Sequence, residues 1–179
     1  MTHRLFFGIK PPAPVRHALL ERQHGVVQAR WQNEEQLHLT LQFLGDVEPP
    51  LADDLAHHAS RLSFAPFEIS EEGAGLFERK GVPRLLYARV RDCEPLASLQ
   101  KKIARLVHDL GIATRERSFT PHITLARLNT SSGPVTSWLS QNAELCVRPW
   151  QVDSFILYES HLGATGSHYE PVSIYPAHR

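Results

Sequence analysis

The spacing of apolar residues predicts a chain of mixed strands and helices. Alternation or short apolar runs predict seven β-strands. They fall at residues 4–9, 37–44, 64–69, 84–90, 121–127, 152–158 and 169–174. Apolar residues at every third or fourth position predict four helices, at residues 14–26, 51–62, 96–110 and 135–139. The helix at 96–110 has the clearest apolar stripe, and Gly111 is placed to cap its end.

Three other segments are predicted to be irregular. Glycine and charged residues dominate residues 73–83, and small or polar residues dominate 129–134 and 163–166, so all three are expected to be loops. Because strands and helices do not alternate strictly, the pattern favours the α+β class over a doubly wound parallel sheet. No linker or low-complexity tract divides the sequence, which predicts a single domain over residues 1–179.

Two of the predicted strands contain a similar short motif. The first copy is Leu37-His38-Leu39-Thr40-Leu41, and the second is Pro121-His122-Ile123-Thr124-Leu125, nearly half the chain away. The order of strands and helices around each copy is also roughly similar. This repetition predicts two related, pseudo-symmetric lobes that each contribute one strand to a common site.

The motif has a geometric meaning in a β-strand. Residues two positions apart point to the same face, so His38 and Thr40 project together, as do His122 and Thr124. The apolar residues between them are expected to be buried on the opposite face; these are Leu37, Leu39, Leu41, Phe43, Ile123 and Leu125. If the two lobes face each other, two imidazoles and two hydroxyls converge.

Such a group of side chains suits phosphodiester chemistry. One neutral histidine can take a proton from water while one imidazolium protonates the departing oxygen. Threonine hydroxyls can donate hydrogen bonds to the non-bridging phosphate oxygens. An ordinary pKa of about 6.5 allows histidine to fill either role at neutral pH. This scheme requires no metal and no other cofactor.

The composition narrows the class of partner. Apolar residues make up 42% of the chain and charged residues 21%, which is typical of a globular protein. Lys plus Arg equals Asp plus Glu at 19 each, so the formal net charge is zero. Broad attraction to nucleic acid is therefore not expected, and any RNA contact should be local, at an end of the molecule.

Cysteine usage and hydropathy predict a cytoplasmic protein. Cys93 and Cys146 lie outside any C-x-x-C motif, and two free thiols fit a reducing compartment. The first ten residues contain too short an apolar run for a signal peptide, and no stretch approaches the ~18 apolar residues of a membrane span. We expect no membrane association and no obligate protein partner.

The paired motifs resemble those of the two-histidine (2H) phosphoesterase superfamily, in which each motif is His-x-Thr/Ser-x with a hydrophobic last residue. The flanking segments are more closely similar to the bacterial RNA 2′,3′-cyclic phosphodiesterases, historically called 2′-5′ RNA ligases. The segments that carry this likeness are 4–9, 37–45, 121–127 and, more weakly, 155–160 with Tyr169. Together they span nearly the whole chain.

This resemblance implies both a fold and a reaction. The implied fold is bilobal, with two antiparallel sheets around a central cleft and helices on the outside. The implied reaction is metal-independent hydrolysis of a 2′,3′-cyclic phosphate on an RNA end or nucleotide to a 2′-phosphate, with 2′-5′ ligation as a side activity. By the family pattern His38 donates a proton to the leaving 3′ oxygen and His122 accepts one from water, while Thr40 and Thr124 bind the phosphate.

Three further residues have open roles. A guanidinium suits a phosphate, and the family often carries an arginine at the position of Arg127. Strict alternation, however, places Arg127 on the face opposite His122 unless the strand ends or bulges, and a surface salt bridge is an equal alternative. Phe7 and Tyr158 are aromatic residues that could stack a base, although aromatic residues in strands more often belong to the core.

Other function classes stay open at this point. The same residues would serve a 2′-5′ oligonucleotide or cyclic nucleotide phosphodiesterase of the same superfamily. A non-catalytic module that binds RNA ends is the alternative outside enzymology. A metal-dependent hydrolase is disfavoured, because the two histidines lie on separate strands without clustered carboxylates, and no H-E-x-x-H motif is present.

Overall fold

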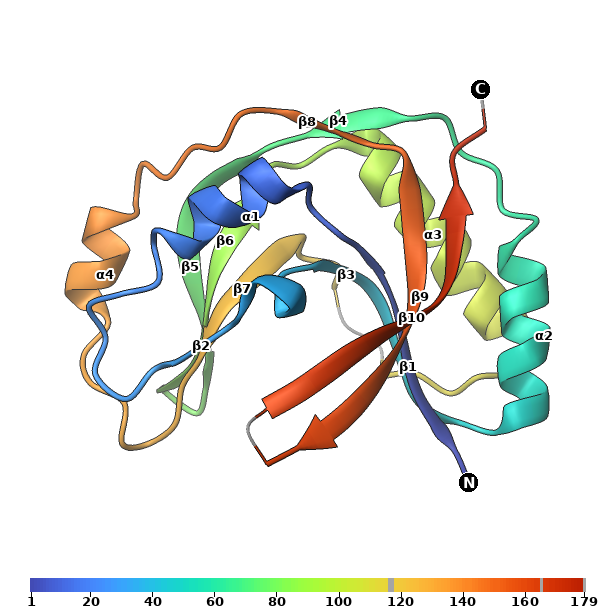
Figure 1. The fold of residues 1–179 in the computed structure, drawn as a ribbon, viewed down its shortest axis with the longest axis horizontal. Coiled ribbons are helices and arrows are strands. Elements are labelled where there is room, and N and C mark those ends of the chain that lie inside the picture. The colour runs from blue at the N-terminus through green and yellow to red at the C-terminus, as the bar shows by residue number, and fades with distance from the viewer. Residues whose placement is uncertain (116–117, 165, 179) are drawn as a thin grey trace.

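A computed structural model describes residues 1–115, 118–164 and 166–178 and shows an α+β fold (Figure 1). The strands are β1 (His3–Ile9), β2 (Arg30–Trp31), β3 (Leu39–Val47), β4 (Phe67–Ile69), β5 (Glu71–Arg79), β6 (Val82–Val90), β7 (His122–Arg127), β8 (Trp150–Val152), β9 (Ser154–Gly163) and β10 (Gly166–Pro176). The helices are α1 (Ala13–Leu20), α2 (Pro49–Ala59), α3 (Glu94–Asp109), α4 (Thr136–Gln141) and the 3₁₀ turn η1 (Glu34–Gln36).

Eight of these strands form one large sheet. Seven lie in the order β10-β9-β1-β3-β7-β6-β5, and β2 pairs with β7, while β4 and β8 form a separate two-stranded sheet. Every named pairing is antiparallel. At the middle of the large sheet, β3 and β7 share a single residue pair, Leu39 with Ile123. The sheet therefore consists of two halves, each extensively paired within itself, that meet at one point.

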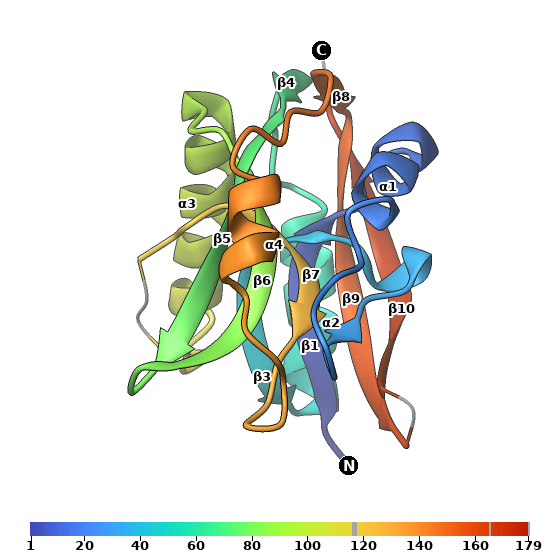
Figure 2. The same ribbon diagram turned by 90° about the vertical axis from the view of Figure 1, so that its left-hand side faces the viewer.

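Helices lie on both sides of the strands. Figure 1 shows α2 and α3 side by side, and Figure 2 shows α3 and α1 on opposite sides of the sheet. Helix α3 is strongly amphipathic, and its buried residues Leu96, Leu99 and Ile103 contribute to the main core. None of the described helices is long and apolar enough to cross a membrane.

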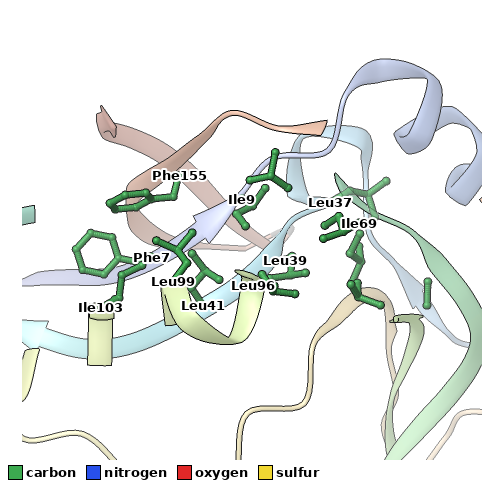
Figure 3. Close-up of a cluster of buried hydrophobic side chains, with 14 of the residues drawn as sticks. Phe7, Ile9, Leu37, Leu39, Leu41, Ile69, Leu96, Leu99, Ile103 and Phe155 are labelled. Carbon is green, nitrogen blue, oxygen red and sulfur yellow. The ribbon is translucent and has the colours of Figure 1, made fainter. Parts of the chain in front are cut away.

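The main core lies between α3 and the central strands. Figure 3 shows Phe7 of β1 and Leu41 of β3 beside Leu99 and Ile103 of α3, with Phe155 of β9 nearby. All five side chains are almost completely buried. Large apolar side chains that leave water in this way each stabilise the fold by roughly 1.5–3 kcal/mol. The core thus fixes one face of β1 and β3 and leaves the other face for the motif histidines.

The predicted α+β class is confirmed, but one predicted loop is wrong. Residues 73–83 form most of a β-hairpin, in which β5 and β6 join through Lys80 and Gly81, both at positive φ. Irregular pairing near Gly73 and near Glu78 interrupts the alternation that would have indicated a strand. Strands β2 and β8 were also not predicted, and they are only two and three residues long.

Other element boundaries differ from the predicted ones by a few residues. Helix α1 ends at Leu20, so Val26, which was assigned to that helix, lies in the following loop and is buried there. The predicted cap of α3 is confirmed by the positive φ of Gly111. The loop predicted at 163–166 includes residue 165, which lies outside the described residues. The single-domain organisation stays a prediction.

Strand β3 does not alternate regularly along its whole length. Leu37, Leu39 and Leu41 are buried as predicted, but Phe43 is 61% exposed, so its assignment to the core is wrong. Two register shifts against β1 leave Leu41 and Leu44 without a partner. Each extra residue reverses the alternation, and Phe43 consequently faces Phe6, on the same side of the sheet as His38.

A carboxyl group is buried where the chain passes from β4 of the small sheet to β5 of the large sheet. Glu71 has 0% exposure, and Nε1 of Trp150 in β8 donates to both its carboxyl oxygens, at 3.0 and 3.3 Å. Burial raises the pKa of Glu71 from 4.5 to about 7, although the hydrogen bond from Trp150 opposes this shift. The neutral carboxyl group is therefore the form that the folded protein prefers.

This burial predicts a loss of stability as pH rises from about 4.5 to about 7. The folded state holds its proton up to about pH 7 and the unfolded chain only to about 4.5, so the free energy of unfolding falls as pH rises between these values. In Glu71→Gln this fall should be absent. The difference in unfolding free energy between variant and wild type should change by roughly 2 to 3 kcal/mol between about pH 5 and pH 8. Urea denaturation at several pH values measures this difference. If the unfolding free energies of wild type and variant changed in parallel with pH, Glu71 would not have a raised pKa in the folded state.

Candidate active site

The four motif side chains lie on one face of the sheet, around the point where its halves meet. Because Leu39 is paired with Ile123 in antiparallel register, the positions of His38 and Thr124 lie opposite each other, as do those of Thr40 and His122. Ile123 and Leu39 are fully buried on the other face. The single β3–β7 pair thus brings the two motifs together, and we call the side that carries both histidines the histidine face.

The ring of His38 is held at both nitrogens. Nδ1 lies 2.7 Å from the carbonyl oxygen of Gln36, and Nε2 lies 3.0 Å from the hydroxyl oxygen of Thr40. A carbonyl oxygen can only accept a hydrogen bond, so Nδ1 carries the hydrogen. In the neutral ring, Nε2 is then an acceptor for the Thr40 hydroxyl. The proton that can be gained or lost is therefore the one on Nε2, on the histidine face.

His122 has the same arrangement at Nδ1. This nitrogen lies 2.6 Å from the carbonyl oxygen of Thr120, which again stands two residues before the histidine. The hydrogen on Nδ1 is fixed in the same way, and Nε2 is again the nitrogen available for chemistry. Both motifs therefore orient Nδ1 of their imidazoles through a carbonyl group of the local backbone.

Burial and nearby positive charge keep both imidazoles neutral. For His38, burial lowers the pKa from 6.5 to about 4, against the hydrogen bond to Gln36, and the charges of Arg127 and His122 lower it further. For His122, burial also lowers the pKa, against the hydrogen bond to Thr120, and Arg127 adds to the decrease. The positive charge of Arg127 therefore acts on both imidazoles and disfavours a further charge on either ring.

Aromatic side chains surround each histidine. Phe6 and Tyr169 lie 4.8 and 4.9 Å from the His38 ring, and Tyr158 stacks on Phe6. Around His122, Phe77 and Tyr87 lie 4.9 and 5.2 Å away. These rings border both imidazoles and contribute to the burial that lowers their pKa.

The two aromatic residues singled out in the sequence, Phe7 and Tyr158, are both buried. Phe7 is completely buried in the main core, which is the place that the sequence favoured for it over base stacking. Tyr158 does belong to the histidine face, but it is only 5% exposed and packs with Phe6 and Ile156. A bound base could not reach its ring without a rearrangement.

A β-bulge changes the direction of Arg127. In the pairing of β7 with β6, Thr124 lies opposite Tyr87 and Ala126 opposite Leu86, so Leu125 is left without a partner. The extra residue shifts the alternation by one position. Arg127 is exposed and projects from the same face as Thr124, which removes the geometric objection raised by strict alternation. Its phosphate-binding role stays a prediction.

Sequence reasoning missed several residues of the histidine face. Arg89 lies directly opposite His122, and Arg30 lies opposite Arg127. Single arginines carry no sequence signal, and the strand that brings Arg30 there has only two residues. Phe77 lies in the segment 73–83, for which the sequence predicts a loop, although it belongs to β5. Tyr87 lies against Gly75, where an added Cβ would come within 2.5 Å of its ring.

Two surface hollows of the described chain lie away from the two histidines. One, of about 340 Å³, is bordered by Glu21 and Gln141, and the other, of about 410 Å³, is bordered by Ala56 and Ile174. The central cleft implied by the resemblance therefore stays a prediction. Within residues 1–115, 118–164 and 166–178, no three His, Cys, Asp or Glu side chains gather as ligands for a metal ion.

Two His-x-Thr strands that meet on one face of an α+β sheet are the arrangement of a two-histidine phosphoesterase. The chain belongs to the 2′-5′ RNA ligase superfamily, whose sequence profile matches residues 12–164. The matched region contains both motifs, Arg127 and most of the aromatic residues around the histidines.

Curated relatives agree with this membership. A protein of Thermus thermophilus is 35% identical over 178 residues, covering 93% of this chain and 86% of the relative. A Thermotoga maritima protein is 30% identical over 165 residues, covering 90% and 84%. A Geobacillus stearothermophilus protein is 30% identical over 150 residues, but this chain spans only 47% of its length. All three are named RNA 2′,3′-cyclic phosphodiesterase.

Solved structures share the fold. A crystal structure of a Thermus thermophilus protein has a TM-score of 0.77 at 30% identity and covers 97% of both chains. The crystal structure of E. coli LigT complexed with 3′-AMP has a TM-score of 0.81 at 24% identity and covers 100% of both chains. The second likeness concerns the fold alone.

The free protein is expected to hold His38 neutral in the Nδ1–H tautomer. Nuclear magnetic resonance of ¹⁵N-labelled imidazoles should show His38 titrating near pH 4, because burial and the nearby charge of Arg127 disfavour its charged form. The His38→Ala variant assigns the signal by its loss. A midpoint at the ordinary value of 6.5, or an Nε2–H tautomer, would disprove this description of the site.

Proposed function

We propose that this protein is an RNA 2′,3′-cyclic phosphodiesterase, which hydrolyses a terminal cyclic phosphate on RNA or a nucleotide to a 2′-phosphate. The observation that carries the proposal is the meeting of two oriented histidines and two threonines on one face of the sheet. Membership of the superfamily and the names of relatives that match most of this chain support the same activity.

In the proposed reaction, His122 and His38 act as base and acid. Nε2 of His122 takes a proton from water, whose oxygen attacks phosphorus. The bond from phosphorus to the 3′ oxygen breaks, and Nε2 of His38 gives this oxygen a proton. The products are a 2′-phosphate and a free 3′ hydroxyl. The order of the two roles rests on the family pattern, because both histidines have similar environments.

Three groups can stabilise the charge on the non-bridging oxygens. The hydroxyls of Thr40 and Thr124 project beside the histidines, and the Thr40 hydroxyl can turn from Nε2 of His38 to the phosphate. Arg127 adds a permanent positive charge to the same face. A ribose hydroxyl that replaces water in this transfer would give 2′-5′ ligation, which we assign as a side activity.

The low pKa of His38 has a direct bearing on its role as an acid. In the free protein the ring is neutral at neutral pH. A bound phosphodiester brings a negative charge, which favours the imidazolium form and partly neutralises the effect of Arg127. Substrate binding should therefore raise the pKa of His38, so that the acid becomes charged when its proton is needed.

We place this reaction in the cytoplasm and expect RNA ends to be the partner. Cys93 and Cys146 are both free thiols, as a reducing compartment allows. Arg30 and Arg89 extend the positive charge of Arg127 across the neighbouring strands, which favours a substrate with more than one phosphate. A mononucleotide with a single phosphate would contact fewer of these three arginines.

Removing either histidine should nearly abolish turnover and leave the fold intact. Thr40→Ala and Thr124→Ala should each remove one hydrogen bond to the developing charge and cost roughly 2 to 3 kcal/mol of transition-state stabilisation. The assay is a short RNA that ends in a 2′,3′-cyclic phosphate, incubated in chelator with wild type, His38→Ala or His122→Ala.

Identification of the terminal phosphate decides between the alternatives. A 2′-phosphate formed by wild type alone supports the proposed reaction and its metal independence. A folded wild-type protein that binds the RNA without product would instead indicate a binding module. Turnover of 2′-5′ oligonucleotides in its place would indicate the other phosphodiesterase of the superfamily. Full activity of either histidine variant would remove that histidine from the mechanism.

The dependence of rate on pH should be bell-shaped, because one histidine must be charged and the other neutral. The profile of kcat/KM reports the free enzyme, in which both pKa values are lowered, so its maximum should lie below pH 6.5. The profile of kcat should lie at higher pH, because bound phosphate raises the pKa of the acid. A flat profile between about pH 5 and pH 8 would contradict catalysis by one charged and one neutral histidine.

A further inference from the structure

Gln36, two residues before the first motif histidine, makes contacts in three directions. Its carbonyl oxygen accepts the hydrogen of His38 Nδ1 at 2.7 Å. Its side-chain oxygen accepts from the backbone N–H of Asn33 at 2.9 Å, while the Asn33 side chain accepts from the Gln36 N–H at 3.0 Å. This reciprocal capping box fixes the short turn η1.

The third contact reaches a distant part of the chain. Nε2 of Gln36 donates to the carbonyl oxygen of Ser167 at 2.7 Å. Ser167 belongs to β10, and two residues further along the same strand is Tyr169, which meets the His38 ring edge-on with the ring centres 4.9 Å apart. Gln36 therefore touches His38 directly and also holds the strand that carries Tyr169.

Sheet order explains why this strand needs a tether. Strand β10 is at the edge of the sheet, and β9 and β1 separate it from the strand that follows His38. Within the described residues, β10 pairs only with β9. Tyr169 thus reaches His38 across two intervening strands, and the hydrogen bond from Gln36 is a direct link between this part of β10 and the segment that carries His38.

His122 shows the contrasting case. Tyr87 lies on β6, which is hydrogen-bonded directly to the histidine's own strand, and Phe77 lies on β5, the next strand. Extensive backbone pairing holds both rings near His122 without a side-chain tether. The two motifs therefore differ in what holds the aromatic rings against the histidine. Strand pairing does so at His122, and a side-chain hydrogen bond contributes at His38.

We propose that Gln36 is a positioning residue, which holds the His38 ring between its own carbonyl group and the Tyr169 ring and so keeps water away from that histidine. The proposal deepens the phosphodiesterase function proposed above and rests on it for its catalytic meaning. It assigns Gln36 no contact with substrate. The prediction for the free protein stands on geometry alone and needs no activity.

The test replaces Gln36 by an apolar side chain of similar length, in Gln36→Met. This variant loses the donor to Ser167 and also the oxygen that accepts from the Asn33 N–H, and it introduces no charge. Released from its tether, Tyr169 should admit water to His38, and the pKa of His38 should rise by roughly one unit. Other charged or titratable groups that face His38 are unchanged; they are His122 and Arg127 from β7, Tyr158 from β9 and Tyr169 itself.

Two further variants separate the tether from other effects. Asn33→Ala removes the other half of the capping box, the bond from the Gln36 N–H, but leaves the bond to Ser167, so it should not change the titration of His38. Tyr169→Leu removes the aromatic cover and should raise the pKa of His38 by itself. Adding Gln36→Met to Tyr169→Leu should then produce little further rise, because both changes act through one contact. Circular dichroism checks that each variant folds.

The kinetic readout distinguishes positioning from binding. In Gln36→Met, kcat should fall roughly tenfold while KM changes less than about twofold, because the substrate still binds to a misplaced acid. An unchanged titration of His38, or equal changes in Gln36→Met and Asn33→Ala, would overturn the proposal. If wild type proves inactive on cyclic phosphates, the proposed function fails, but the titration still decides the positioning role.

Discussion

One backbone pairing, between Leu39 and Ile123, joins the two halves of the eight-stranded sheet. On the buried side, it brings two aliphatic side chains together in the main core. On the other side, it sets the relative positions of His38 and His122, each one residue from the pair. Each half has its own dense network of strand pairs, so the relation between the two histidines depends on how two largely self-contained halves meet at this point.

The chemistry of the site follows from its low polarity as much as from its histidines. Aromatic rings border both imidazoles, so an unbound site disfavours positive charge on either ring. Arg127, which cannot give up its charge, increases this effect. A negatively charged ligand reverses the balance, because it compensates the arginine and favours an imidazolium. In the proposed enzyme, the substrate itself completes the protonation state that the reaction requires.

The sequence was sufficient for the motif residues, the α+β class and the strongest helix, because each depends on local periodicity. The alternation in residues 37–41 and 121–125 placed the polar pairs opposite the aliphatic residues, as Leu39 and Ile123 confirm. It failed at Phe43 and did not determine the face from which Arg127 projects. In both strands a β-bulge shifts the alternation by one residue, and the residue types do not reveal it. The tether from Gln36 to Ser167 joins positions 131 residues apart, and no local pattern could have indicated it.

The matching carbonyl contacts at Nδ1 of both histidines have a consequence for repeated turnover. Neither ring can pass a proton through itself, from one nitrogen to the other, without giving up a hydrogen bond of 2.7 or 2.6 Å. After one proposed hydrolysis, His122 holds a proton and His38 lacks one. Restoring the starting state must therefore proceed on the histidine face, through direct transfer or through water that enters as product departs. Product release and resetting of the two imidazoles thereby share a single route.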